Sequence, residues 1–262
     1  MDNLWSKEQI EALGQAGCKF TQGGSHISRT IMLAELRQVL DAVPSGSSPN
    51  TYHSAILTLN ILGKGTESTR QKSLRHLREL YALDEATLVF ALLRKLHTMD
   101  SASLPLLALQ IAWARDPLLR ATTSPVLEAS EGERVETASL AEAVEAVFPN
   151  QYSELNRNKI ARNAASSWTQ SGHLVGRARK TRQRVKPSPV SITMAFLLGD
   201  IAGYHGAAVF TNPWCRLLDL NPDGAKVLGF EAHRAGLLNL RAVGEVVELS
   251  FPLFVEFQGQ PS

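Results

Sequence analysis

Apolar residues recur at helical spacing over most of this chain, and short Gly-, Pro- or Ser-containing segments separate the stretches. Several stretches begin with a hydroxyl side chain suited to an N-cap, such as Ser6, Ser103 and Ser153. The pattern therefore predicts a mostly helical protein, with helices over residues 6–15, 28–43, 55–62, 66–81, 84–99, 103–116, 137–148, 153–171, 188–206 and 221–235.

Two segments depart from helical spacing. Residues 237–251 contain two alternating runs around Val243 and Gly244, which predict a small C-terminal β-hairpin. Between Arg177 and Arg184 basic residues recur at almost every second position, which favours an extended strand or wing with a row of guanidinium groups on one face. Because this basic arm follows a helix after a tight turn, it is typical of the end of a winged helix. The terminal hairpin follows a helix in the same way, but it carries little charge, and we expect it to pack.

The pattern also suggests how the helices are organised. The helix over 103–116 is apolar on nearly all sides, and we expect it to be the buried centre of the N-terminal half. Near Ser130 the composition turns acidic, and we place a domain boundary there. The predicted fold class is therefore mostly α, with two packed helical subdomains. Residues 1–130 contain a helix-turn-helix-like segment, and residues 131–262 contain the basic arm and a winged-helix-like β-hairpin.

Charge is strongly segregated along the chain. Residues 156–186 hold nine Lys and Arg and no Asp or Glu, whereas the remainder holds 18 basic and 25 acidic residues. Clustered cations of this kind favour a polyanion, because dense phosphate charge rewards them through counterion release. A solvated, partly disordered basic linker is the alternative. The candidate nucleic-acid-binding residues are Arg177, Arg179, Lys180, Arg182, Arg184 and Lys186 on the arm and Arg157, Lys159 and Arg162 on the preceding helix.

A second basic segment follows the turn Gly63-Lys64-Gly65. The helix after it buries Leu74 and Leu77. Two helices joined by such a turn have the outline of a helix-turn-helix, although any antiparallel helix pair has it too. The candidate second contact comprises Arg70, Lys72, Arg75 and Arg78. Trp168 is an aromatic that could stack on a base, but its helical spacing favours the core.

The sequence offers no motif for catalysis. Its seven His are scattered, without metal-ligand spacing, and GKGTES at Gly63 fails as a phosphate-binding loop. Glu142 and Glu145 fit a solvated helix face better than a metal site. We expect no enzyme activity, no cofactor and no metal. Cys18 and Cys215 fit buried thiols, and no apolar run spans a bilayer or forms a signal peptide, so a cytoplasmic protein without membrane contact is expected.

Several segments together resemble a known family. TQGGSHISRTIMLAELRQVL, then NILGKGTESTRQKSLRHLREL, then LLALQIAWARDPLLRATTSPVLEAS occur in an order similar to that of the BrxA proteins (DUF1819 type) of BREX phage-defence systems. The chain is longer than those proteins, and its basic arm after Gly176 departs from their pattern. The resemblance implies a non-enzymatic helical protein that binds DNA and works with a methyltransferase, a phosphatase-like protein and an ATPase.

The prediction is therefore a DNA-binding accessory protein of a phage-defence system. It would contact double-stranded DNA mainly through phosphates. Two alternatives remain open: a protein-interaction adaptor whose basic arm docks on an acidic partner, and an RNA-binding helical module.

Overall fold

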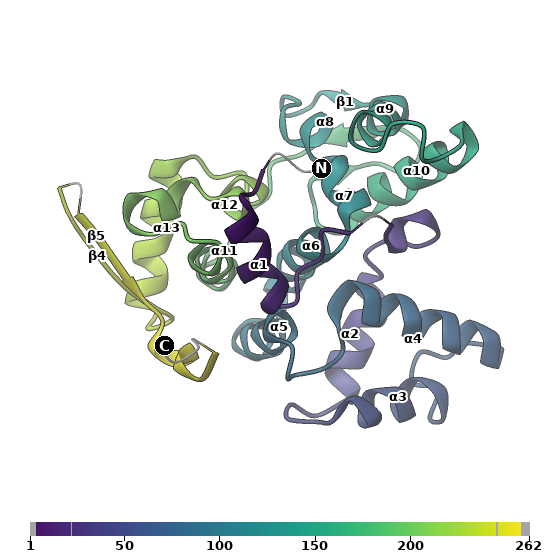
Figure 1. The fold of residues 1–262 in the computed structure, drawn as a ribbon, viewed down its shortest axis with the longest axis horizontal. Coiled ribbons are helices and arrows are strands. Elements are labelled where there is room, and N and C mark those ends of the chain that lie inside the picture. Colours follow the sequence, from purple (N-terminus) through teal and green to yellow (C-terminus); the bar gives the residue numbers. More distant parts are fainter. Residues whose placement is uncertain (1–3, 22, 245, 258–262) are drawn as a thin grey trace.

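The computed structural model describes residues 4–21, 23–244 and 246–257 (Figure 1). Within these residues the fold is mostly α-helical, with a small antiparallel hairpin near the C-terminus, as the sequence predicts. Helix α6 (Leu104–Arg115) lies at the centre, and all of its residues except Pro105 are buried. Figure 1 shows it between three groups of elements. Helices α5 (Leu88–Met99) and α11 (Pro189–Ile201) pack against it, and α1 (Lys7–Gln15) packs against α11.

The first group is N-terminal and is joined to the centre by the 3-10 helix η1 (Ser25–Ile27). Its longest helix, α4, begins at the N-cap Thr66, whose hydroxyl accepts the Thr69 amide. The loop between α3 and α4 spans residues 58–66, longer than the three or four residues typical of a helix-turn-helix. The group comprises α2 (Leu33–Ala42), α3 (Pro49–Leu57) and α4 (Glu67–Tyr81).

The second group has the element order of a winged helix. Three of its helices share a small apolar core, formed by Leu118, Ala121, Val144, Phe148 and Ile160. Its sheet has the strand order β1-β3-β2, in which β3 is antiparallel to both neighbours. We call this group the winged-helix unit; it comprises α7 (Pro117–Ala121), α8 (Thr123–Leu127), β1 (Arg134–Val135), α9 (Thr137–Val147), α10 (Glu154–Gln170), β2 (Leu174–Val175) and β3 (Lys180–Arg182).

The third group carries the terminal hairpin. One face of the hairpin packs through Leu240 and Leu249, whereas Arg241, Val243 and Val246 on the other face are exposed. The expected packing role of this hairpin thus applies to one of its faces. The group comprises η3 (Gly206–Thr211), α12 (Pro213–Leu217), α13 (Pro222–Arg234), β4 (Asn239–Val243), β5 (Val246–Ser250) and η4 (Pro252–Phe257), and the 3-10 helix η2 (Ser101–Ser103) lies between α5 and α6.

One buried apolar cluster includes residues of all three groups, such as Leu36, Leu140 and Leu240. Trp5, Trp113 and Trp214 come from the beginning, middle and end of the chain, and their rings meet with centroids 5.2–6.2 Å apart. The expected boundary near Ser130 lies between α8 and β1, inside the winged-helix unit. The core is therefore shared across that position.

Candidate nucleic-acid interface

Helix α10 is amphipathic, and its apolar side faces the core. The Ser153 hydroxyl caps the helix by accepting the Asn156 amide at 3.4 Å. Ile160, Ala164 and Trp168 are fully buried, and the Trp168 indole donates to the Thr122 hydroxyl at 2.9 Å. Trp168 is therefore a core residue and is not available to stack on a base.

The opposite side of α10 presents a polar stripe to solvent. Lys159 and Arg162 are exposed, and within the described residues neither side chain makes an ion pair or hydrogen bond. Arg157 differs, because its guanidinium lies 2.8 Å from Glu145 and 2.9 Å from the Tyr152 carbonyl oxygen. Lys159 and Arg162 thus carry uncompensated positive charge, whereas Arg157 holds α10 to α9.

The wing is the loop of residues 176–179 between β2 and β3. Gly176 has φ +100°, and a Cβ there would overlap the Arg179 carbonyl oxygen, so the tight turn requires glycine. Lys180 closes the loop by donating to the Gly176 carbonyl oxygen at 2.8 Å. Arg177 and Arg179 are exposed at its tip, without side-chain partners among the residues that the structure describes.

The prediction that one face of this arm presents a row of guanidinium groups is wrong. Only Lys180–Arg182 form a strand, and Arg182 is buried, with 1% of its surface exposed. Its guanidinium pairs with the Asp219 carboxylate and donates to the Gln183 carbonyl oxygen at 2.6 Å. Alternation along a strand sends successive side chains to opposite faces, and here the inner face meets Asp219. Arg182 is therefore a structural ion-pair residue and cannot reach a phosphate.

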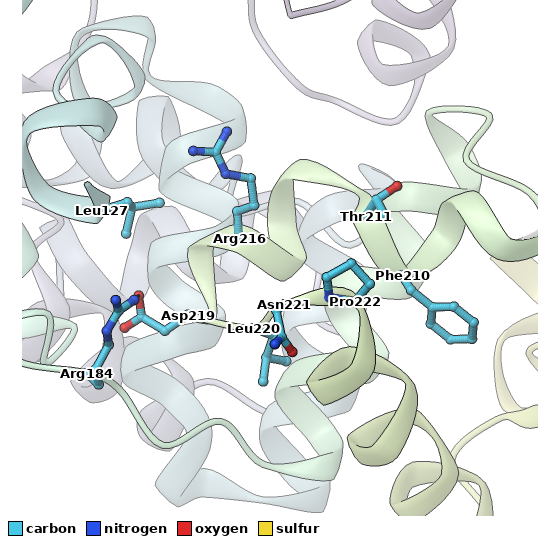
Figure 2. A pocket seen from close by; sticks show the side chains of 9 residues that line it. All are labelled: Leu127, Arg184, Phe210, Thr211, Arg216, Asp219, Leu220, Asn221 and Pro222. Atoms are coloured by element: carbon cyan, nitrogen blue, oxygen red, sulfur yellow. The ribbon is translucent and has the colours of Figure 1, made fainter. Parts of the chain in front are cut away.

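The end of the arm lies beside a surface pocket of about 630 Å³. Arg184 is half-exposed, but its guanidinium lies 3.2 Å from Asp219, so its charge is partly compensated. Figure 2 shows Arg184 directed at Asp219, whereas Arg216 points away from that pair. Lys186 is exposed and lines a second pocket together with Ser103, Ser171 and Ser188.

The four basic residues of α4 do not form one face. Lys72, Arg75 and Arg78 are exposed and follow one another at three-residue spacing along one side of the helix. Arg70 is half-buried, and its Nε is sealed from solvent without a hydrogen-bond partner. Arg70 lies about 160° around the helix from Lys72, so three of the four cations lie along the exposed side and Arg70 does not.

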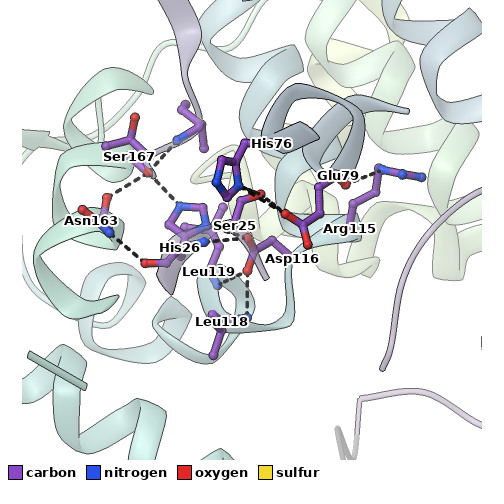
Figure 3. Close-up of polar contacts among 12 residues, drawn as sticks. Ser25, His26, His76, Glu79, Arg115, Asp116, Leu118, Leu119, Asn163 and Ser167 are labelled. Carbon is purple, nitrogen blue, oxygen red and sulfur yellow. Dashed lines mark hydrogen bonds and ion pairs between the residues drawn. The ribbon is translucent and has the colours of Figure 1, made fainter. Parts of the chain in front are cut away.

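A buried polar network joins α4 and α10 through η1 (Figure 3). Ser25 donates to Glu79 of α4 at 2.6 Å and lies 3.1 Å from the His76 ring. On the other side, Asn163 of α10 donates to the His26 carbonyl oxygen at 2.8 Å. The Ser167 hydroxyl accepts the Ile31 amide at 2.9 Å. The network fixes the two basic helices relative to one another.

Part of this network has the geometry of a catalytic triad. His26 Nε2 lies 2.8 Å from Ser167 Oγ, and His26 Nδ1 lies 2.8 Å from Asp116 Oδ2. All three side chains are sealed from solvent, and the Ser167 hydroxyl also bonds to the Asn163 carbonyl oxygen. A nucleophile must reach a substrate, so this arrangement serves as a structural clamp.

The sequence did not indicate this network. Its members are far apart in the chain and include two of the scattered His, His26 and His76. The one signal was the pair Gly23-Gly24, because a Cβ on Gly24 would overlap the Asp116 carboxylate. The adjacent glycines before Ser25-His26 thus mark a close backbone approach.

Three further expectations concern the cysteines, metal binding and membrane spans. Cys18 and Cys215 are buried free thiols, as predicted, and burial raises the pKa of Cys18 to about 12. Within residues 4–21, 23–244 and 246–257, His, Cys, Asp and Glu form no group able to hold a metal ion. Over the same residues, each helix is too short or too polar to cross a bilayer.

Comparison with known proteins gave no family assignment. No protein-family model matches the chain, and a search of curated proteins found no significant match.

Proposed function

We propose that this protein binds double-stranded DNA through the winged-helix unit, with α10 lying along a groove and the wing on the adjacent backbone. The observation that carries the proposal is the pair of uncompensated cationic sites on this unit. Lys159 and Arg162 line the solvent side of α10, and Arg177 and Arg179 occupy the wing tip. A helix of this kind fits the major groove of B-DNA.

The charges elsewhere on the unit support the same assignment. Glu142 and Glu145 lie on α9, and Glu145 neutralises Arg157. Among the described residues of this unit, the exposed cations without an acidic partner therefore lie on α10 and the wing. Contacts to phosphates from Arg and Lys would supply affinity without sequence information.

The role in the cell is part of the proposal. The segment order similar to BrxA proteins supports an accessory, non-enzymatic function in phage defence, beside a methyltransferase, a phosphatase-like protein and an ATPase. The order TQGGSHISRT, then the Arg-containing helix α4, corresponds to η1 and its buried contacts to α4.

A titration of labelled duplex at several salt concentrations tests DNA binding. The Arg177→Ala/Arg179→Ala variant should lose affinity, and the slope of log K against log salt should flatten by about 1.8, or about 0.9 per phosphate contact. Arg234→Ala/Arg241→Ala is the matched control, since it removes two exposed cations from the third group. Absence of duplex binding by the wild type at low salt would refute the proposal.

The same assay separates the alternatives. An RNA competitor that displaces the duplex at equal concentration would favour an RNA-binding module. A partner protein retained by the wild type after nuclease treatment, but lost in the wing variant, would favour the adaptor.

A further inference from the structure

Two arginines from different segments, Arg29 and Arg75, lie near the His76 ring, outside the winged-helix unit. Arg75 Nη2 lies 3.2 Å from His76 Nε2, and the Ser28 hydroxyl lies 3.2 Å from the same nitrogen. Arg29 follows Ser28, donates to its carbonyl oxygen at 2.9 Å, and is close enough to help lower the pKa of His76. Burial is the largest cause of that lowering, and Arg75 is the next.

The acidic group nearest to this pair is already engaged. Glu79 accepts a hydrogen bond from Ser25 at 2.6 Å and lies 3.3 Å from His76 Nδ1, on the opposite side of the ring from Arg75. The guanidinium groups of Arg29 and Arg75 make no ion pair among the described residues. The pair therefore retains a net positive charge at the surface.

This cationic pair borders the solvent stripe of α10. The chain from His26 to Leu33 runs along α10 and is held by Asn163, Ser167 and Gln170. At 100° per residue, Lys159 and Ser166 occupy the edge of the α10 stripe next to those three positions. The stripe, Arg29 and Arg75 thus follow one another across the surface, in the order α10, η1 and α4.

We propose that Arg29 and Arg75 form a second phosphate-binding site that extends the duplex contact of the winged-helix unit onto α4. The site takes backbone phosphates of the same DNA molecule. It rests on the proposed function, because the duplex bound by α10 presents those phosphates. The planar guanidinium forks match phosphate oxygens in pairs.

The buried clamp accounts for the rigidity that such a divided site needs. Ser25 and His76 join η1 to α4, and His26 and Ser167 join it to α10. A phosphate site held at a fixed distance from the groove-binding helix binds without an additional ordering cost.

The test compares variants at several salt concentrations on duplexes of about 10 and about 20 base pairs, one and two helical turns. Arg29→Ala/Arg75→Ala should flatten the salt slope by about 1.8 on the longer duplex and by much less on the shorter one. Arg29→Lys/Arg75→Lys should restore most of the slope, because ammonium groups also neutralise phosphates. Arg234→Ala/Arg241→Ala should leave the slope unchanged.

The possible results separate this inference from the proposed function. An unchanged slope in Arg29→Ala/Arg75→Ala, together with lost binding in Arg177→Ala/Arg179→Ala, overturns the second site and leaves winged-helix binding intact. No duplex binding by the wild type overturns both. If the double variant unfolds, Arg75→Ala alone decides the question, since its exposed side chain can be removed without opening the core, and the slope should flatten by about 0.9.

Discussion

His26 Nδ1 lies 2.8 Å from Asp116 Oδ2, and both side chains are sealed from solvent although 90 residues separate them in the chain. Asp116 also caps α7 by accepting the amides of Leu118 and Leu119. Its pKa is lowered because the nearby His26 ring and these hydrogen bonds outweigh the effect of burial. One carboxylate therefore fixes η1 and the first helix of the winged-helix unit.

Removing this carboxylate should be costly. Asp116→Ala leaves the His26 ring and the start of α7 without their acceptor, and we expect a loss of about 3 to 5 kcal/mol in the free energy of unfolding. Urea denaturation measures it. A double-mutant cycle with His26→Ala should give a coupling energy on the order of 1 kcal/mol or more, and additive losses would contradict the paired arrangement.

Gly24 should tolerate no side chain. Its φ is +154°, and a Cβ would overlap the Asp116 carboxylate, so Gly24→Ala should cost about 2 kcal/mol. Gly14→Ala is the matched control, because Gly14 lies in α1 and a Cβ added there would meet no atom within 4 Å. That change should stabilise by about 0.5 kcal/mol. Equal melting temperatures for the two variants would be the contrary result.

The arm should divide into binding and folding residues. Arg182→Ala leaves Asp219 buried without its main partner and should destabilise the fold by about 3 to 5 kcal/mol. Arg177→Ala removes an exposed wing-tip side chain and should change stability by less than about 0.5 kcal/mol while weakening DNA binding. Thermal melts and duplex titrations on the same preparations distinguish them. A stable Arg182→Ala protein would contradict the buried ion pair.

His173 should make stability depend on pH. Burial is the main cause that lowers its pKa to about 4, and its Nε2 lies 2.8 Å from the Leu217 carbonyl oxygen. The folded state thus favours the neutral ring. The neutral ring contributes its full stabilisation above the ordinary pKa of about 6.5, and this contribution is lost as the pH falls toward about 4. The free energy of unfolding should fall by about 3 kcal/mol over this range.

Urea denaturation between those two pH values, with His173→Gln alongside, measures the effect. Glutamine retains a donor for the Leu217 carbonyl oxygen but does not titrate. The variant should therefore show a shallower fall in stability than the wild type. Parallel pH profiles for the two proteins would show that His173 is not responsible.

Much of the fold could be predicted from local pattern. The N-caps Ser6 and Ser153 and the hairpin around Gly244 lie where the sequence places them, because capping and strand alternation depend on neighbouring residues. Ser103 takes the N-cap position of α6, but its hydroxyl contacts Asp100 and Ser188 and makes no cap hydrogen bond. The predicted helix from Ser28 instead begins at Leu33, since the irregular segment 28–32 is held along α10 by its backbone contacts to Ser167 and Gln170. Tertiary contacts overrode the local preference there.

The candidate site was only partly predictable. By itself the sequence determined that cations gather in residues 156–186 and that a helix followed by a wing carries them. Only the tertiary structure decided which cations are exposed, because Asp219, 37 residues beyond Arg182, buries one of them. The same holds for Arg29 and Arg75, which come near the same His76 ring only after folding. Charge is a local property of the sequence, but its solvation depends on partners that are distant in the chain.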